Sequence, residues 1–167
     1  MSDLAVPAPA PAGPKASSRI YTPEQRIRRD QTRWTLVQGV LAPLQFLVFL
    51  VSLGLVLRFM MTGEGQGWAA GSVVVKTLVL YLIMVTGAIW EKVVFGRYLF
   101  ASAFFWEDVV SMGVIALHTL YLVAWLQGDA WLSVEAQMWI ALAAYAIYVI
   151  NAAQFLLKLR QARIESA

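Results

Sequence analysis

The sequence predicts an all-α, polytopic membrane protein: a four-transmembrane-helix bundle with a short N-terminal amphipathic interfacial helix. Of its 167 residues, 60% are hydrophobic and only 14% are charged, and the mean hydropathy is +0.66. A soluble domain of this length would need far more polar surface to cover its core. Four long apolar runs, each near the ~20 residues that cross a hydrocarbon layer as a helix, lead to the same class.

The domain organisation follows from where these runs lie. Residues 1–19 are rich in proline and alanine and contain no continuous apolar core, so we expect a disordered tail rather than a signal peptide. Residues 20–167 are the predicted four-helix membrane domain. Its spans are expected at about 34–60, 72–92, 106–126 and 135–158.

A basic stretch, YTPEQRIRRDQTRW, separates the tail from the first span. Thr22 is the expected N-cap, Pro23 suits the first helical position, and Gln25 completes a capping box. We expect the helix to lie on a membrane surface that carries anionic lipid, which makes membrane lipid a predicted partner. No nucleic-acid partner is expected. The arginines of the stretch are Arg26, Arg28, Arg29 and Arg33.

Basic residues are distributed unevenly over the loops. Of 13 lysines and arginines, only Arg58 and Lys76 fall on the side of the loops that join spans one to two and three to four. The positive-inside rule then places both termini in the cytoplasm. The predicted location is therefore multi-pass, in an inner membrane.

The cysteine and histidine counts exclude several kinds of cofactor. The chain has no cysteine, so it forms no disulfide, no thiolate-held iron–sulfur cluster and no thioether haem attachment. Its one histidine, His118, excludes a bis-histidine haem within one chain. A zinc site with several histidine ligands is disfavoured for the same reason.

Two nearly identical words, WEKVV and WEDVV, stand sixteen residues apart at the edges of apolar runs. Glu91 ends span two and Glu107 begins span three, and Trp90 and Trp106 precede them. Aromatic residues are common at a membrane interface. The carboxylates, Asp108 included, are either interface anchors and helix-dipole partners or groups that take part in chemistry.

Polar side chains mark one face of each span. Glu107, Ser111 and His118 share a face of span three, and Glu107 and His118 would lie roughly 16 Å apart along its axis. They could touch opposite ends of one large, flat ligand. Because polar groups in lipid are costly, we expect these faces to meet inside the bundle, either as interhelical contacts or as a binding site. The other members are Gln38, Gln45, Tyr81, Asn151 and Gln154.

Five strings of this sequence resemble one known family. They are YTPEQRIRRD, WTLVQGVLAPLQFLVFLVSL, KTLVLYLIMVTGAIWEKVVFGRYLFASAFFWEDVVSM, ALHTLYL and YVINAAQFLLKLR. They resemble the BchF family, 3-vinyl bacteriochlorophyllide hydratase of phototrophic bacteria, from about Tyr21 to Arg163. The central stretch, Lys76–Met112, is the most distinctive part.

The resemblance implies hydration of the C3-vinyl group of chlorophyllide a or 3-vinyl bacteriochlorophyllide to a 1-hydroxyethyl group, in bacteriochlorophyll a biosynthesis. The substrate is then a chlorophyllide-type tetrapyrrole, and the location an inner or intracytoplasmic photosynthetic membrane. Addition of water to a vinyl group conjugated with a macrocycle needs no redox cofactor, metal ion or nucleotide, so no cofactor is expected. It needs an acid, a positioned water with a base, and an apolar slot for the ring.

We assign the roles by our own inference. Glu107 is the expected general acid, and Glu91 or Asp108 the group that orients or deprotonates the water. His118 faces the macrocycle, as an axial ligand to the substrate's magnesium or as a hydrogen-bond partner of a ring carbonyl. The basic residues Arg97, Lys158 or Arg160 receive the substrate's propionate.

Other functions fit the same pattern of residues. A non-catalytic pigment carrier or assembly factor would use the aromatic slot and the histidine but would not need the acids. A small proton-coupled exporter would place its carboxylates nearer the membrane midplane. A haem or quinone subunit is disfavoured by the histidine and cysteine counts. A homo-oligomer or a complex with other pigment-pathway enzymes is a further expectation.

Overall fold

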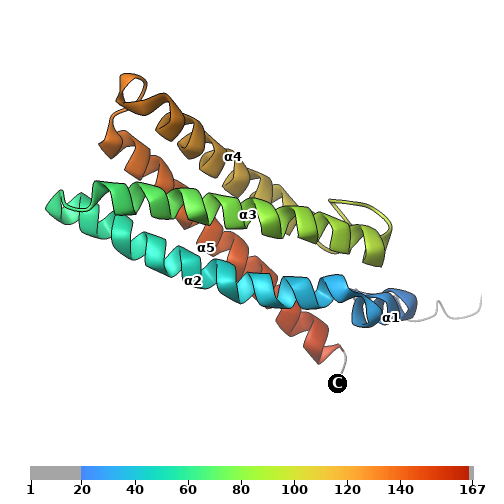
Figure 1. Cartoon of the computed structure of the whole chain (residues 1–167). Helices are drawn as coiled ribbons and strands as arrows, with labels where there is room; N and C mark the ends of the chain where they lie inside the picture. The colour runs from blue at the N-terminus through green and yellow to red at the C-terminus, as the bar shows by residue number, and fades with distance from the viewer. Residues whose placement is uncertain (1–19, 166–167) are drawn as a thin grey trace, which may run out of the picture.

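The computed structural model describes residues 20–165 (Figure 1), and the predicted disordered tail lies outside them. No strand occurs in that range. Four of its helical segments are long and apolar enough to cross a membrane, which confirms the predicted all-α class with four spans after a short N-terminal helix. The elements are α1 (Pro23–Gln31), α2 (Arg33–Thr62), α3 (Gln66–Phe95), α4 (Phe105–Gln127), the 3-10 helix η1 (Gly128–Ala130) and α5 (Val134–Ile164).

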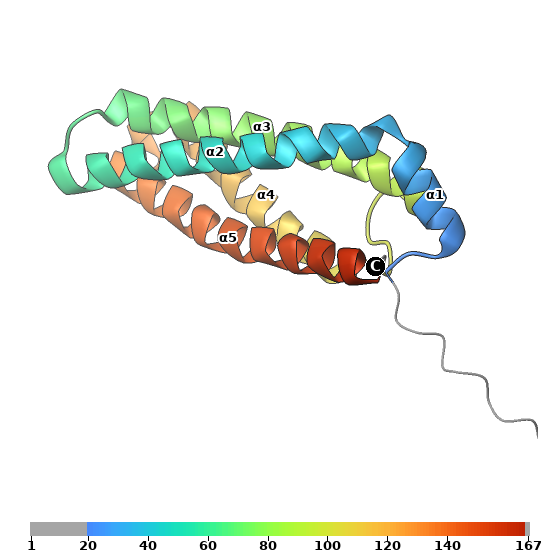
Figure 2. The same cartoon turned by 90° about the horizontal axis from the view of Figure 1, so that it is seen from below.

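The four long helices form two antiparallel hairpins. α2 lies beside α3, and α4 lies beside α5 (Figures 1 and 2). In Figure 2 the two hairpins come together toward the α2–α3 turn and separate toward α1. The chain that connects α3 to α4, the start of α1 and the end of α5 all lie at the separated end, which we call the α1 end.

Local capping determines where the helices begin and end. The predicted capping box is present: the Gln25 amide donates to Oγ1 of Thr22 at 3.2 Å, and the Thr22 amide donates to Oε1 of Gln25 at 2.9 Å. α3 is bounded by Gly65 and Gly96, whose φ angles of 81° and 87° favour glycine. Hydrophobicity alone marks only the central part of this helix, so the predicted span from residue 72 to 92 is shorter than α3.

The early start of α3 changes the position of Lys76. The sequence groups this lysine with the loop opposite the basic termini, but it lies ten residues after Gln66, the first residue of the helix. At ~1.5 Å per residue this is roughly 15 Å into the helix. The Lys76 side chain is fully buried. A lysine therefore lies at the centre of the bundle.

The main core lies where the two hairpins are close together. Phe49 of α2 contacts the rings of Tyr145 and Tyr148 of α5, at centroid distances of 5.4 and 5.0 Å. Hydroxyl groups join three helices near these rings: the Ser52 hydroxyl shares hydrogen bonds with Ser72 at 2.7 Å and with Tyr145 at 2.5 Å. Interhelical hydroxyl contacts of this kind are typical of membrane bundles.

A second core closes the α1 end. Its buried members are Ile20, Tyr21, Val94, Phe104 and Ala162, and Trp90 and Phe95 pack against them. The Tyr21 ring stacks on Phe95 at 5.7 Å and lies 6.4 Å from Phe104. The Ile20 amide donates to Glu165 at 2.9 Å. The segment just before α1 thus joins the end of α3 to the end of α5.

Candidate active site

Three carboxyl groups are buried at the α1 end of the bundle. Glu91 lies in the second-last turn of α3, and Glu107 and Asp108 lie in the first turn of α4. All three are more than nine-tenths buried. They are the three residues predicted from the sequence as catalytic, and the fold brings them to one end of the membrane domain.

Glu91 and Asp108 form a carboxyl pair between α3 and α4. The chain between the two helices brings them together: the Phe100 amide donates to Asp108 Oδ2 at 2.7 Å, and the next amide, that of Ala101, donates to Glu91 Oε2 at 3.3 Å. Two carboxylates that share a site repel each other, which favours a proton on one of them.

Phe100 adopts an unusual backbone conformation next to this pair. Its φ of 58° is in the left-handed region, where it is the one non-glycine residue among residues 20–165. Strained backbone of this kind costs about 1–3 kcal/mol and concentrates at functional sites. Here the conformation aims the Phe100 amide at Asp108.

Glu107 turns away from the pair toward α5. Its Oε1 lies 3.7 Å from Nζ of Lys158. Its Oε2 accepts no hydrogen bond from any residue between 20 and 165, although the side chain is only 7% exposed. Its backbone carbonyl accepts from Asn151 at 2.9 Å and from Ser111 at 2.8 Å. Adjacent residues of α4 therefore face different helices.

One face of α5 lies opposite Glu107. Asn151 and Lys158 both contact Glu107, and Gln154 is spaced at i+3 and i−4 from them, so it lies on the same face. Oε1 of Gln154 is buried and finds no partner within the part of the chain that is described. Lys158 also donates to the Ala103 carbonyl at 2.6 Å. The sequence suggested Lys158 only as a contact for the propionate, and its ion pair was not foreseen.

The two tryptophans of the doubled word have different positions. Trp90 belongs to the aromatic core of the α1 end, with its ring 5.8 Å from both Phe95 and Phe104, and its Nε1 donates to Thr35 at 2.9 Å. Trp106 is 68% exposed and contacts its neighbour Phe105. Only Trp90 belongs to the buried core, so the two repeated words are not equivalent in the structure.

His118 and Lys76 lie together in the centre of the bundle. Both side chains are 0% exposed. Nδ1 of His118 contacts the Val114 carbonyl at 2.8 Å, and Lys76 Nζ lies 3.8 Å from the centroid of the Tyr148 ring. Within residues 20–165, neither His118 Nε2 nor Lys76 Nζ has a hydrogen-bond partner. Lys76 was not among the predicted site residues. The feature of the sequence that could have identified it is a single charged residue within an apolar run.

The remaining predicted site residues divide into interior and surface groups. Gln38 donates to Thr86 at 2.8 Å, and Tyr81 shares a hydrogen bond with Thr119 at 2.7 Å, so both join neighbouring helices. Gln45 is only 2% exposed and neither its nitrogen nor its oxygen is paired within the described range. It lies one turn from Phe49, on the side of the α1 end. Arg97 and Arg160 are exposed there.

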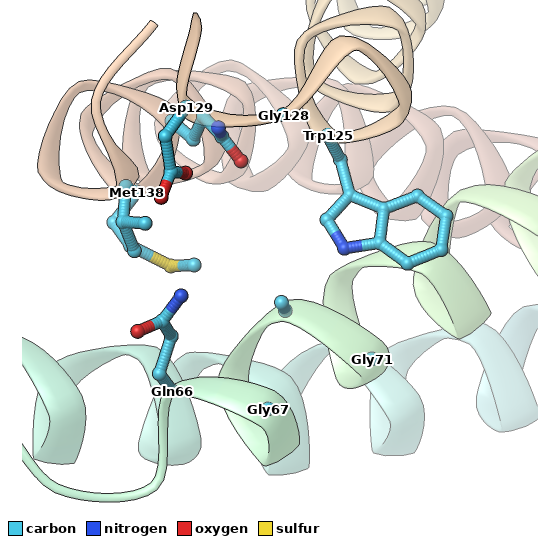
Figure 3. Close-up of a pocket in the computed structure, with 10 residues that line it drawn as sticks. Gln66, Gly67, Gly71, Trp125, Gly128, Asp129 and Met138 are labelled. Carbon is cyan, nitrogen blue, oxygen red and sulfur yellow. The ribbon is translucent and has the colours of Figure 1, made fainter.

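A cavity lies at the other end of the molecule (Figure 3). It measures about 290 Å³ and is lined from the start of α3 and from the residues around η1, with Gln66, Trp125, Asp129 and Met138 among them. This is at the lower limit of the ~300–1,000 Å³ of small-molecule sites. It does not coincide with the buried carboxyl groups. No group of three or more metal-binding side chains occurs in residues 20–165.

Fold and site together define a small four-span membrane protein with a buried carboxyl cluster at one end. Residues 21–161 match the family model described as 2-vinyl bacteriochlorophyllide hydratase (BCHF). The 2-vinyl bacteriochlorophyllide hydratase of Cereibacter sphaeroides is 67% identical over 93% of this chain and 94% of its own length. That of Rhodobacter capsulatus is 65% identical over 94% of this chain and 91% of its own.

This chain belongs to the 2-vinyl bacteriochlorophyllide hydratase family, which confirms the predicted resemblance. No solved structure matches it.

Proposed function

We propose that this protein is a hydro-lyase that adds water to the vinyl group of a bacteriochlorophyllide-type tetrapyrrole, giving a 1-hydroxyethyl group. The family match and two relatives above 60% identity support this activity. The vinyl carbon numbered 2 in the family description is numbered 3 in the current ring numbering, so both names refer to one group. The activity belongs to bacteriochlorophyll biosynthesis.

The reaction requires two proton transfers and no change in oxidation state. A proton adds to the terminal vinyl carbon, and the π electrons form the new C–H bond. The cation left on the inner carbon is delocalised into the macrocycle. Water attacks that carbon and loses a proton. Two titratable groups in a place with little bulk water can perform these steps.

The observation that carries the proposal is the cluster of buried carboxyl groups at the α1 end. Glu91, Asp108 and Glu107 come from two helices, and the aromatic rings of Trp90 and Phe104 pack at the same end. Apolar rings beside acid groups suit a flat macrocycle that must be protonated. We therefore keep these three residues as the catalytic set.

Three binding roles complete the proposal. His118 contacts the macrocycle, through the magnesium of the substrate or a ring carbonyl, with its Nε2. Arg97 and Arg160, exposed at the α1 end, receive the propionate.

Both termini lie on the cytoplasmic side, because the basic residues gather at that end. Membrane lipid contacts the apolar outer surface, and a homo-oligomer or other pigment-pathway enzymes are further partners.

The test is conversion of a vinyl-bearing chlorophyllide or bacteriochlorophyllide by membranes that contain the protein, in ¹⁸O-labelled water. We expect a product heavier by one labelled water, with the label on the carbon attached to the ring. Membranes without the protein are the control. Pigment that is recovered bound but unchanged would contradict the hydratase and favour the alternative, a non-catalytic tetrapyrrole carrier or assembly factor.

His118 is tested by pigment retention. We expect His118→Ala to leave the protein in the membrane and to lower the amount of pigment that copurifies with it, because the ring nitrogen that meets the macrocycle is lost. The absorption spectrum of the purified protein gives the pigment ratio. Retention equal to that of the unchanged protein would remove this role.

A further inference from the structure

We propose that Glu107 and Gln154 bind the water that is added to the substrate and that Glu107 accepts its proton, while the Glu91–Asp108 pair supplies the proton that goes to the vinyl group. This rests on the hydratase function proposed above and goes further, because it divides the acid and base roles among the three carboxyl groups. The hypothesis drawn from the sequence has the opposite division, with Glu107 as acid.

Two buried atoms of the same chemical type lack a partner beside Lys158. Glu107 Oε2 and Gln154 Oε1 are both acceptors, and neither receives a hydrogen bond from the residues that the structure describes. Leaving a buried acceptor unpaired costs about 1–3 kcal/mol. Gln154 lies on the face of α5 that meets Glu107, because Asn151 and Lys158, on either side of it, contact Glu107. A ligand that satisfies both acceptors has to offer two hydrogen-bond donors.

Water is the ligand that matches this arrangement. It has two O–H donors for the two acceptors, and its lone pair stays free to attack carbon. The hydratase reaction consumes water as its second substrate. A pyrrole or hydroxyl group of the pigment offers one donor only, so it would leave the other acceptor unpaired.

Glu107 has a different electrostatic environment from the other two carboxyl groups. The Lys158 ammonium lies 3.7 Å from Glu107 Oε1 and is also held by the Ala103 carbonyl at 2.6 Å. An adjacent cation favours the carboxylate, which is the form that accepts a proton. The carboxyl pair has the opposite character: the consecutive amides of Phe100 and Ala101 hold Asp108 and Glu91 close together, and repulsion between two carboxylates favours a proton on one of them. Lys158 touches no reacting atom, so it is a positioning residue.

The steps balance in atoms and charge. The carboxyl pair gives its proton to the terminal vinyl carbon and becomes more negative beside the cation that forms. The lone pair of the bound water makes the C–O bond, and its proton goes to Glu107. After product release the proton returns from Glu107 to the pair through solvent, so no proton is consumed. Glu107 and Asp108 are neighbours in the chain, which keeps this return short.

The two roles are separated by an isotope experiment in D₂O on membranes that contain the full chain. Reversible protonation of the vinyl group puts deuterium into the terminal CH₂ of recovered substrate, and capture by water gives the alcohol. We expect Glu107→Gln to lower hydration by about 10²–10⁴-fold but to retain deuterium exchange into the substrate. Glu91→Gln and Asp108→Asn should lose both.

Two further variants test the rest of the water site. Gln154→Leu should lower kcat on the order of tenfold, the value of one lost hydrogen bond to a reacting group, with KM for the pigment unchanged. Lys158→Met should resemble Glu107→Gln, and Lys158→Arg should restore activity because it restores the ion pair. Glu135→Gln is the matched control, since Glu135 is exposed at the other end of α5. The Glu135→Gln variant should hydrate the substrate and exchange deuterium into it as the unchanged protein does.

The result that overturns the proposal is loss of deuterium exchange together with hydration in Glu107→Gln, or full hydration in that variant. Protein content in the membrane and the thermal midpoint in detergent show whether each variant is folded. If Glu107→Gln does not fold, Gln154→Leu tests the same water site. If the unchanged protein gives no labelled product, the proposed function fails and this inference fails with it. If it hydrates but the variants differ from expectation, only the division of roles fails.

Discussion

Glu107 and Asp108 show that the role of a carboxyl group depends on its neighbours in the fold. The two side chains are adjacent in the sequence and alike in chemistry, but one helical step of about 100° turns them to different partners. Asp108 meets another carboxyl group and a backbone amide near the end of α3, whereas Glu107 meets a lysine of α5. Two acids with different partners can perform opposite proton transfers.

Lys76 gives a prediction about stability. Its ammonium is buried without a hydrogen-bond partner in residues 20–165, and it lies over the Tyr148 ring. A cation–π contact is worth about 0.5–2 kcal/mol and offsets only part of the desolvation cost of several kcal/mol. Lys76→Met keeps the length of the side chain without its charge. We expect it to stabilise the protein by about 1–4 kcal/mol.

The measurement is the thermal midpoint in detergent. Lys92→Met is the matched control, because Lys92 is exposed in the last turns of α3, and its midpoint should change little. A lower midpoint in Lys76→Met than in the unchanged protein would mean that the charge has a partner that stabilises it.

At the scale of the elements, the segment just before α1 connects the two hairpins. Tyr21 stacks on Phe95 and contacts Phe104, and the Ile20 amide binds Glu165 at the end of α5. The hairpins separate at this end in Figure 2, so these contacts close the bundle around the carboxyl groups. We expect their loss to open that end.

Tyr21 makes this connection sensitive to high pH. Burial raises the pKa of Tyr21 above its ordinary value of 10.0, although the Arg29 guanidinium 4.8 Å from the ring opposes this change. The neutral phenol is therefore the form that the folded protein prefers. Its contribution to stability is complete below pH 10 and is lost as pH rises through the higher pKa of the folded protein.

Tyr21→Phe keeps the stacked ring but cannot ionise. We expect both proteins to have similar thermal midpoints at pH 8, and the unchanged protein to fall below Tyr21→Phe as pH rises above 10. The comparison removes the effect of other groups that titrate in this range. A constant difference between the two midpoints over the whole range would contradict the role of the phenol.

At the scale of the whole molecule, we expect the two ends of the bundle to lie on opposite sides of the membrane, because four helices are long enough to cross it. The α1 end carries Arg97 and Arg160, and the other end carries Glu64 and Asp129. Because the natural chain has no cysteine, single cysteines report the side directly. Arg97→Cys and Arg160→Cys should react with a membrane-impermeant thiol reagent only from the cytoplasmic side, and Glu64→Cys and Asp129→Cys only from the other side.

Labelling of intact cells and of inverted vesicles provides the measurement, with the cysteine-free chain as the blank. Reaction of Arg97→Cys and Asp129→Cys from the same side would contradict four spans. Reaction of all four from the sides opposite to those expected would retain the fold but reverse the orientation.

Much of the site could be predicted because membrane burial makes polar residues conspicuous. Glu91, Glu107, Asp108 and His118 stand out in apolar runs, and the structure buries all four. The sequence could not predict that Trp106 is exposed and Trp90 is partly buried, since both precede a glutamate at a helix end. Exposure depends on which face of each helix meets a neighbour, and periodicity is weak in helices that are apolar all round.

The sequence by itself determined the four apolar spans, the capping box of the first helix and the family, because length, hydropathy and local hydrogen bonding act within one segment. Tertiary structure alone decided that Asp108 meets Glu91, that Lys158 meets Glu107 and that Lys76 lies in the core. The physical reason is that pairing depends on how the two hairpins are placed. A side chain's partner across helices is not encoded in its own segment.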